Sequence, residues 1–408
     1  MATSEVFSFT GSGGQALSGR LDLPVGHPRA TALFAHCFTC SKQSHAASRI
    51  AAALAARGIA TLRFDFTGLG ESGGDFAETT FASNVEDLLA AAAALDERGQ
   101  APSLLVGHSL GGAAAIVAAG RLQGVAAVAT LAAPAESSHA LKHLGADAER
   151  VRTEGAAEIT LGGRRLRVGR ALVDDLAQDR VLDTLAHLKA AVLVMHAPRD
   201  EVVGIDQATR LFLAAKHPKS FVSLDRADHL LTRREDADYA AEVIAAWASR
   251  YLPAVAAAAE LQPQPGEVIV AEAPGGSRLL QQAAVGRHRL VADEPVEQGG
   301  RDAGPTPYDL LMVALGACTS MTLRLYADRK AIPLERIAVH LRYDRIHAAD
   351  CADCETKEGK IDRFRRELEL TGPLDAGQRQ RLLEIANKCP VHRTLESEIK
   401  VETRLAPA

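Results

Sequence analysis

The stretch "LLVGHSLGGAA" (residues 104–114) decides the fold class, because it joins an apolar run to a helical pattern through the sequence G-x-S-x-G. Gly107 and Gly111 have no side chains, so they permit a sharp turn from a strand into a helix. Such a turn holds the hydroxyl of Ser109 at the carboxyl edge of a sheet and at a helix N-terminus. The motif therefore predicts a nucleophilic serine.

Strand and helix patterns alternate on both sides of this motif. The runs "ATALFAH" (30–36), "IATLRFDF" (59–66) and "AAVLVMHA" (190–197) are almost continuously apolar, and helical patterns such as residues 81–99 separate them. Strands of this kind are buried on both faces, so we predict an α/β fold with a mostly parallel, doubly wound sheet. A charged stretch at about residues 135–188 interrupts the alternation, and we expect a short, irregular cap there.

A serine hydroxyl needs a base to take its proton, and the base needs a carboxylate to orient it. Asp200 follows one apolar strand pattern, and His229 follows the next one. Parallel strands end at the same edge of a sheet, so both loops should reach Ser109. The order of these residues predicts the catalytic triad Ser109, Asp200 and His229.

Other residues near these positions are alternatives. Asp225 and Asp228 lie closer to His229 in sequence than Asp200 does, but neighbours in a loop need not face the imidazole. His45 and two further histidines of the hydrolase half, His139 and His143, are interpreted as surface residues. The basic run "GRRLRVGR" (163–170) is interpreted as a solvated face.

These segments, together with "FDFTGLGES" (64–72), resemble the α/β-hydrolase family over roughly residues 15–250. The resemblance implies a carboxylesterase with two backbone N–H donors for the oxyanion, which match Leu110 and Phe38. Cys37 stands where the family often has glycine, and its side chain narrows this loop. A short cap favours small or aromatic esters as substrates.

The alternation of strands and helices ends in a polar run that contains prolines. This run predicts an interdomain linker at residues 253–266, between a hydrolase domain at 1–252 and a second domain at 267–408. The second domain has strand patterns around one long helical pattern at about residues 307–329 and another at 375–389. That order favours an α+β domain.

Two cysteines of the second domain lie in helical surroundings, Cys318 in "LLMVALGACTSM" and Cys389 in "NKCPVHRTL". Alone, each is explained as a small core residue. Together with "GPTPYDLL" (304–311), the pair resembles the OsmC/Ohr family over about residues 267–404. The resemblance implies that Cys318 attacks an organic hydroperoxide, that Cys389 resolves the sulfenic acid as a disulfide, that a dithiol is the reductant, and that the domain forms a homodimer.

The resemblance also implies an arginine that keeps the attacking thiolate ionised, for which Arg287 and Arg289 are the candidates. The glutamate that usually holds this arginine is replaced by Tyr308, with Asp309 next to it. The alternative interpretation is therefore an esterase whose OsmC-like domain is only a dimerisation or binding module.

A metal site has weak support. Cys351 and Cys354 are spaced C-x-x-C near His347, but a second such pair is missing, so we expect neither a metal nor another cofactor. The similar "CFTC" (37–40) falls in the expected oxyanion loop, where a structural role is the simpler explanation.

Composition limits the partners. Lysines and arginines number 46 against 51 acidic residues, a net charge of −5, which favours neither nucleic acid nor an anionic membrane. We see no signal peptide and no apolar run long enough to cross a membrane, so we expect a cytoplasmic protein. Six cysteines are too few for a disulfide scaffold, so any disulfide should be functional.

Overall fold

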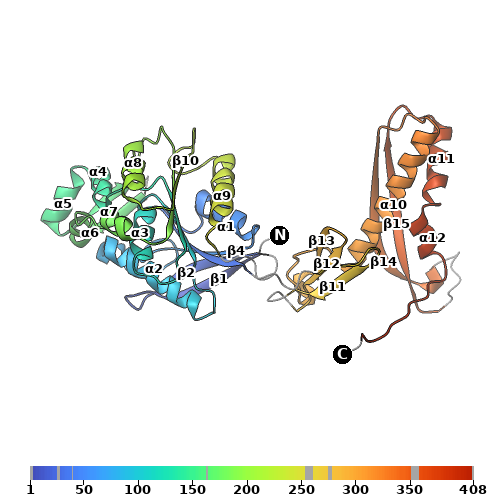
Figure 1. Cartoon of the computed structure of the whole chain (residues 1–408), viewed down its shortest axis with the longest axis horizontal. Coiled ribbons are helices and arrows are strands. Elements are labelled where there is room, and N and C mark those ends of the chain that lie inside the picture. Colours follow the sequence, from blue (N-terminus) through green and yellow to red (C-terminus); the bar gives the residue numbers. More distant parts are fainter. Residues whose placement is uncertain are drawn as a thin grey trace. The chain divides into compact units, whose positions relative to one another are not determined.

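The computed structural model describes residues 3–24, 28–38, 40–161, 164–252, 261–273, 278–350 and 358–406. The chain divides into two compact units, Met1–Arg289 and Leu290–Ala408 (Figure 1). Residues 261–266 of the predicted linker form no helix or strand, whereas 253–260 lie outside the described residues. The division falls within strand β13 (His288–Ala292), so the predicted start of the second domain at residue 267 stays a prediction.

The first unit is built on an eight-stranded sheet with the order β1-β2-β4-β3-β5-β6-β9-β10. β1 and β2 pair antiparallel, and β2 pairs antiparallel with β4, whereas the strands from β4 to β10 are parallel. This arrangement confirms the predicted mostly parallel sheet. The strands are β1 (Thr3–Thr10), β2 (Ala16–Leu23), β3 (Ala30–Ala35), β4 (Ile59–Phe64), β5 (Leu104–His108), β6 (Ala127–Leu131), β9 (Ala191–His196) and β10 (Lys219–Ser223).

Helices cover both faces of this sheet, which explains why its central strands β4, β5, β6 and β9 are buried at every position. Leu105 and Val106 of β5 belong to two different buried clusters, since successive side chains of a strand point to opposite faces. One cluster includes residues of α1 and α9, and the other includes residues of α2, α3 and α8. These helices are α1 (His45–Ala55), α2 (Phe81–Asp96), α3 (Leu110–Ala119), α8 (Ile205–Ala214) and α9 (Arg234–Ala248).

The stretch between β6 and β9 forms the cap, and it is more regular than we expected from the sequence. Its two strands, β7 and β8, pair as an antiparallel hairpin, and short helices flank them. The single elements are too short to show a clear period in the sequence. They are a 3-10 turn (Ser137–Ala140), α4 (Leu141–Leu144), α5 (Asp147–Glu154), β7 (Ala156–Leu161), β8 (Arg164–Gly169), α6 (Arg170–Leu176) and α7 (Val181–His187).

The second unit packs helices against a long strand pair. β14 (Arg336–His347) and β15 (Lys360–Thr371) are antiparallel, and α10 (Pro307–Arg329), which has the predicted bounds, contacts β14. α10 also contacts α11 (Ala376–Ala386) and α12 (Pro390–Leu395). A separate three-stranded sheet contains β11 (Val268–Glu272), β12 (Gln281–Val285) and β13.

Helix α10 is unusually apolar. Within the described part of the chain it is the one helix that is long and apolar enough to cross a membrane, which departs from our expectation that no segment is. Length and composition are weak evidence for a span, because the core helix of a soluble protein passes the same test. Its residues Leu323 and Ala327 are buried with Leu382 and Ala386 of α11.

Candidate active site

Ser109 occupies a sharp turn between β5 and α3, as the motif predicts. Its φ of 55° is rare for a residue with a side chain. A Cβ on Gly111 would lie 2.3 Å from the carbonyl oxygen of His36, and one on Gly107 would lie 2.5 Å from that of Gly111. Both glycines are therefore required for the turn that presents the serine hydroxyl.

The structure joins the three predicted catalytic residues by hydrogen bonds. His229 Nε2 lies 3.0 Å from Ser109 Oγ, and His229 Nδ1 lies 2.8 Å from Asp200 Oδ2. The N–H groups of Val202 and Val203 donate to the other oxygen of Asp200, each at 2.9 Å. Burial alone would raise the pKa of Asp200, but the hydrogen bonds from His229 and these N–H groups outweigh it and lower that pKa. The ionised carboxylate accepts a hydrogen bond from Nδ1–H, which leaves Nε2 without a proton and able to accept that of the serine.

The two alternative carboxylates have other partners. Asp228 accepts hydrogen bonds from backbone N–H groups of its own loop. Asp225 accepts one from the hydroxyl of Ser223. Asp200, twenty-nine residues from His229 in sequence, is the carboxylate that meets its imidazole.

Three buried histidines lie near the hydrogen-bonded residues Asp200, His229 and Ser109, and the sequence analysis missed them. Burial lowers the pKa values of His36 and His196, and it lowers that of His108 to about 4, so these rings are neutral at pH 7. His108 Nε2 donates to the backbone carbonyl of His229 at 2.6 Å, and His196 Nε2 donates to that of Val203 at 2.7 Å. Both bonds hold loops that carry catalytic candidates. A signal was present, since each histidine ends or directly follows a parallel strand.

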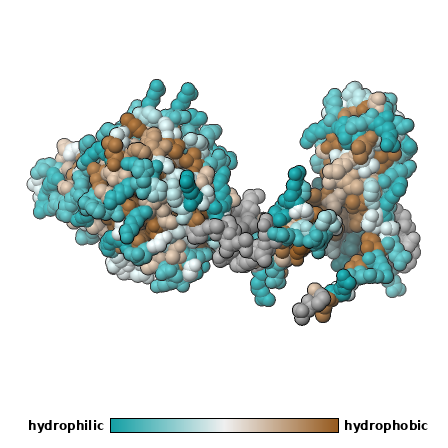
Figure 2. Space-filling view, viewed as in Figure 1, coloured by the Kyte–Doolittle hydropathy of each residue, from teal (hydrophilic) through white to brown (hydrophobic). Residues whose placement is uncertain are grey.

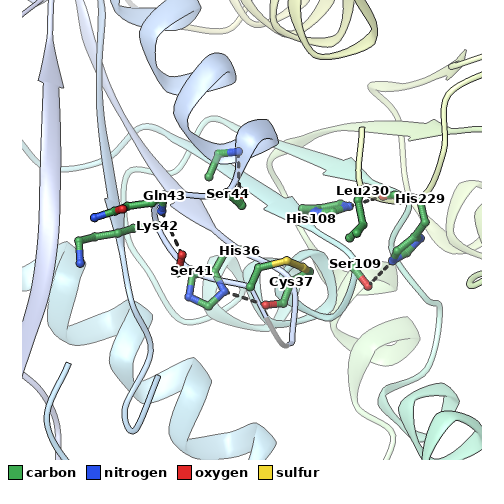
Figure 3. Close-up of a disulfide and its surroundings, with 12 residues drawn as sticks. His36, Cys37, Ser41, Lys42, Gln43, Ser44, His108, Ser109, His229 and Leu230 are labelled. Carbon is green, nitrogen blue, oxygen red and sulfur yellow. Dashed lines mark hydrogen bonds between the residues drawn. A yellow bond between two sulfur atoms is a disulfide. The ribbon is translucent and has the colours of Figure 1, made fainter. Parts of the chain in front are cut away.

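The loop after β3 contains a disulfide between Cys37 and Cys40 (Figure 3). Both cysteines line the same cavity as Ser109, together with Phe38 and Leu110, the two predicted oxyanion donors. Leu110 is the first residue of α3, so its N–H has no acceptor within that helix. The disulfide closes the loop that carries the N–H of Phe38.

A buried ion pair anchors the end of this loop. Lys42 donates to Asp65 twice, through its backbone N–H and through Nζ, each at 2.6 Å, and Nζ also donates to Glu71 at 2.6 Å. Lys42 and Asp65 are almost fully buried. Arg63 donates to the carbonyl of Lys42. The oxyanion loop is thus held by the disulfide within it and by charged side chains behind it.

A cavity of about 650 Å³ opens at Ser109 and His229. His45, His139 and His143 line it, whereas we expected them on the solvated surface. Arg164 of the basic run also lines the cavity. The short cap brings His139, His143 and Arg164 to the site, and α1 brings His45, which the sequence did not indicate.

In the second unit, Cys318 and Cys389 are both free, Cys318 half-buried and Cys389 buried. The N–H of Val391 donates to the sulfur of Cys318 at 3.5 Å, and the next N–H, that of His392, donates to the sulfur of Cys389 at 3.4 Å. Thr319 Oγ1 also lies 3.5 Å from the sulfur of Cys389. The first turn of α12 thus contacts both sulfurs, and Cys318 is a hydrogen-bond partner of Cys389.

Arg366 of β15 is the cation beside this pair, and the sequence analysis missed it. It donates to Thr319 Oγ1 at 2.8 Å and to the side-chain oxygen of Asn387 at 2.7 Å. Burial raises the pKa of Cys389, but its hydrogen bonds with Thr319, the N–H of His392 and Cys318, together with the charge of Arg366, outweigh it, so that pKa is lowered. β15 contains several arginines, and its sequence does not show which one faces α10.

The residues predicted to support the thiolate have other contacts. Arg289 donates to carbonyls of its own hairpin, and Arg287 lies in the turn between β12 and β13. Tyr308 stacks on Tyr343 with ring centroids 4.4 Å apart. Asp309 caps α10 by accepting hydrogen bonds from the N–H and hydroxyl of residue 306.

The weak metal candidates Cys351 and Cys354 lie outside the described residues. His347 ends β14. In the described part of the chain, histidine, cysteine and carboxylate side chains form no group of three that could hold a metal ion.

Comparisons with known proteins support a hydrolase fold for the first half of the chain and an OsmC-like domain in the second half. A family model described as serine aminopeptidase, S33, matches residues 26–151, and one of OsmC-like proteins matches 299–404. The esterase domain of a Rhodothermus marinus protein is 45% identical over 61% of this chain and 99% of its own, with a TM-score of 0.51. The α/β hydrolase GrgF from Penicillium is 18% identical over 61% of this chain and 99% of its own, with a TM-score of 0.52. A search of curated proteins found no match.

Est1E from Butyrivibrio proteoclasticus, a structure with bound ferulic acid, is 21% identical over 60% of this chain and 98% of its own, with a TM-score of 0.50. GrgF and Est1E show a common fold. The Rhodothermus domain shows the family, because its identity is high and almost its whole length is covered. The chain belongs to the α/β-hydrolases and carries an OsmC-like domain in its second half.

Proposed function

We propose that the first unit is a serine carboxylesterase. His229 takes the proton of Ser109 as its oxygen attacks the ester carbonyl, and it then protonates the leaving alcohol. Water attacks the acyl-enzyme by the same route and releases the acid. Asp200 stays ionised and orients the imidazole, while the N–H groups of Leu110 and Phe38 stabilise the oxyanion.

The hydrogen-bonded chain from Asp200 through His229 to Ser109 carries this proposal, because it orders a base and a nucleophile beside an open cavity. The cavity volume of about 650 Å³ suits a small or aromatic ester. The similarity to an esterase domain supports ester hydrolysis over the other reactions that this fold performs.

A fluorophosphonate probe tests the nucleophile directly, because it phosphonylates an activated serine. We expect one label per chain, located on Ser109 by mass spectrometry and lost in His229→Ala. Labelling of a different serine, or equal labelling without the imidazole, would refute the assignment.

We propose a second activity, reduction of organic hydroperoxides by the OsmC-like domain. The thiolate of Cys318 attacks the peroxide oxygen, which yields an alcohol and a sulfenic acid. The thiolate of Cys389 then attacks that sulfur, water leaves, and a dithiol reduces the resulting disulfide. The half-buried Cys318 is the more accessible sulfur, and the lowered pKa of Cys389 favours the resolving step.

The paired sulfurs at the first turn of α12 support this activity over a purely structural role of the domain. We expect full-length protein to consume cumene hydroperoxide when a dithiol is present. Absence of consumption would favour the alternative, an esterase with a dimerisation or binding module.

A further inference from the structure

The cavity beside Ser109 has an uneven charge. Of the residues that the structure describes, nineteen line it, and none of these is an aspartate, a glutamate or a lysine, whereas one is an arginine, Arg164. The carboxylate of Asp200 is not among these residues, and it is buried and bonded to His229. A substrate in this cavity therefore meets one full positive charge and no exposed negative charge.

Arg164 is the first residue of β8, at the tip of the cap hairpin, and Thr160 of the paired strand also lines the cavity. Across the described residues, no carboxylate forms an ion pair with Arg164, unlike Arg180 and Arg210 of the same unit. The positive charge of Arg164 also acts on the buried imidazole of His36. Burial lowers the pKa of His36, and the positive charge of Arg164 lowers it further.

The remaining basic residues of this hairpin behave differently. Arg164, Arg165 and Arg167 are all exposed, but Arg165 and Arg167 do not line the cavity. The run 163–170 is therefore not a uniform solvated face, because the hairpin directs one of its arginines to the substrate.

Residues of the cap that line the cavity add hydrogen-bond donors that suit an anion. His139 Nε2 donates to the carbonyl of Val202 at 3.2 Å, which holds its ring at the cavity. Partial burial, together with the neighbouring His139, lowers the pKa of His143, so this ring is neutral at pH 7. The N–H of a neutral imidazole and the hydroxyl of Thr160 both donate to anions. Apolar side chains such as Leu110 and Val203 complete the lining.

We propose that this site hydrolyses esters that carry a carboxylate in addition to the scissile bond, and that Arg164 is the specificity-determining residue that binds this carboxylate. The inference rests on the proposed esterase function. A guanidinium binds a carboxylate through two parallel N–H···O bonds, which fix the orientation of the carboxylate and pair its negative charge. The apolar lining contacts the carbon chain between the carboxylate and the ester.

Two ester pairs test the proposal, each pair differing only in whether the second carboxyl group is free or methylated. The p-nitrophenyl monoester of adipic acid and its methyl-capped form place the charge on the acyl side. The compound 4-acetoxybenzoate and its methyl ester place the charge on the alcohol side. In at least one pair, we expect wild type to prefer the charged ester by about fivefold in kcat/KM, mainly through KM.

The variant Arg164→Gln should lose this preference, so that its kcat/KM for the charged ester falls to about that for the methyl-capped ester of the same pair. Arg165→Gln, its neighbour outside the cavity, should keep the preference. Salt at about 1 M should weaken the preference of wild type, because the Debye length falls to about 3 Å. No preference in either pair, or an unchanged preference in Arg164→Gln, would overturn the inference.

Failure of the proposed function gives a different result, namely no hydrolysis of the methyl-capped esters by wild type. Binding of monomethyl adipate, measured by calorimetry, then decides the inference without turnover. Weaker binding to Arg164→Gln than to wild type and Arg165→Gln supports a carboxylate site at Arg164. Equal binding to all three proteins refutes it.

Discussion

The serine site and the cysteine site differ in how completely the residues of their own unit enclose them. Asp200 is 8% exposed, and two extensive apolar clusters enclose the sheet that presents the serine site. The cysteine site lies in a unit whose buried cluster has five residues. Figure 2 shows hydrophobic side chains on the surface of this unit. On its helix α10, Val313 is 62% exposed, Met321 66% and Leu325 71%.

From this difference we propose that the serine site is complete in one chain, whereas a further surface covers the cysteine unit. Contiguous exposed apolar side chains on one helix are typical of an interface. A second copy of the chain is the occupant that the OsmC/Ohr resemblance implies, and it would cover α10 with apolar surface. The predictions below test each side of this comparison.

The largest effect should come from Ser109→Ala. We expect hydrolysis of short p-nitrophenyl esters to fall by about four to six orders of magnitude with an unchanged fold, because members of a catalytic triad act as a unit. Steady-state kinetics and circular dichroism measure both quantities. His229→Ala should be similarly impaired. A Ser109→Ala enzyme with wild-type turnover would contradict a complete serine site.

The next effect concerns the cysteine site. Cys318→Ser should abolish the consumption of cumene hydroperoxide with a dithiol, while esterase turnover, measured without the dithiol, stays within about twofold, roughly 0.4 kcal/mol. Each nucleophile is activated locally, so the two changes should be independent. Cys389→Ser should react once and accumulate sulfenic acid, which dimedone labelling detects. Peroxide consumption by Cys318→Ser would make another sulfur the nucleophile.

The exposed helix predicts the oligomeric state. We expect the full chain to be a homodimer in light scattering and Leu325→Glu to be a monomer, because a buried unpaired carboxylate disfavours an apolar interface. Val6→Glu is the matched control, since Val6 is equally exposed at 71% but lies in the first unit. A chain ending at residue 252 should be a monomeric esterase. A monomeric full-length protein would contradict this part of the comparison.

The smallest effect should come from the disulfide of the oxyanion loop. Cys40→Ser should lower kcat by about tenfold or less, which is below the loss of about 10²–10³ for a removed oxyanion donor, because Lys42 and Asp65 still anchor the loop. Treating wild type with dithiothreitol should cause the same decrease and should not affect Cys40→Ser. Equal activity of the reduced and oxidised enzyme would show that the disulfide does not position the loop.

The fold class and the order of the candidate catalytic residues could be predicted from the sequence, because the motifs that indicate them are local. The turn at Ser109 needs glycines two residues away on each side, and α10 follows the N-cap Thr306, whose capping box with Asp309 spans four consecutive positions. Apolar runs show which strands are buried on both faces. Asp200 and His229 followed from the rule that parallel strands end at one edge of a sheet.

Only the tertiary structure decided which side chains meet across long sequence separations. Arg366 reaches Thr319 across 47 residues, although β15 offers other arginines, since the register of β14 and β15 determines which of them faces α10. Arg164 reaches the cavity while Arg165 does not, because the cap folds over the sheet. A sequence records the kind of each charge, but its partners depend on how separate elements pack, and that packing is a property of the whole fold.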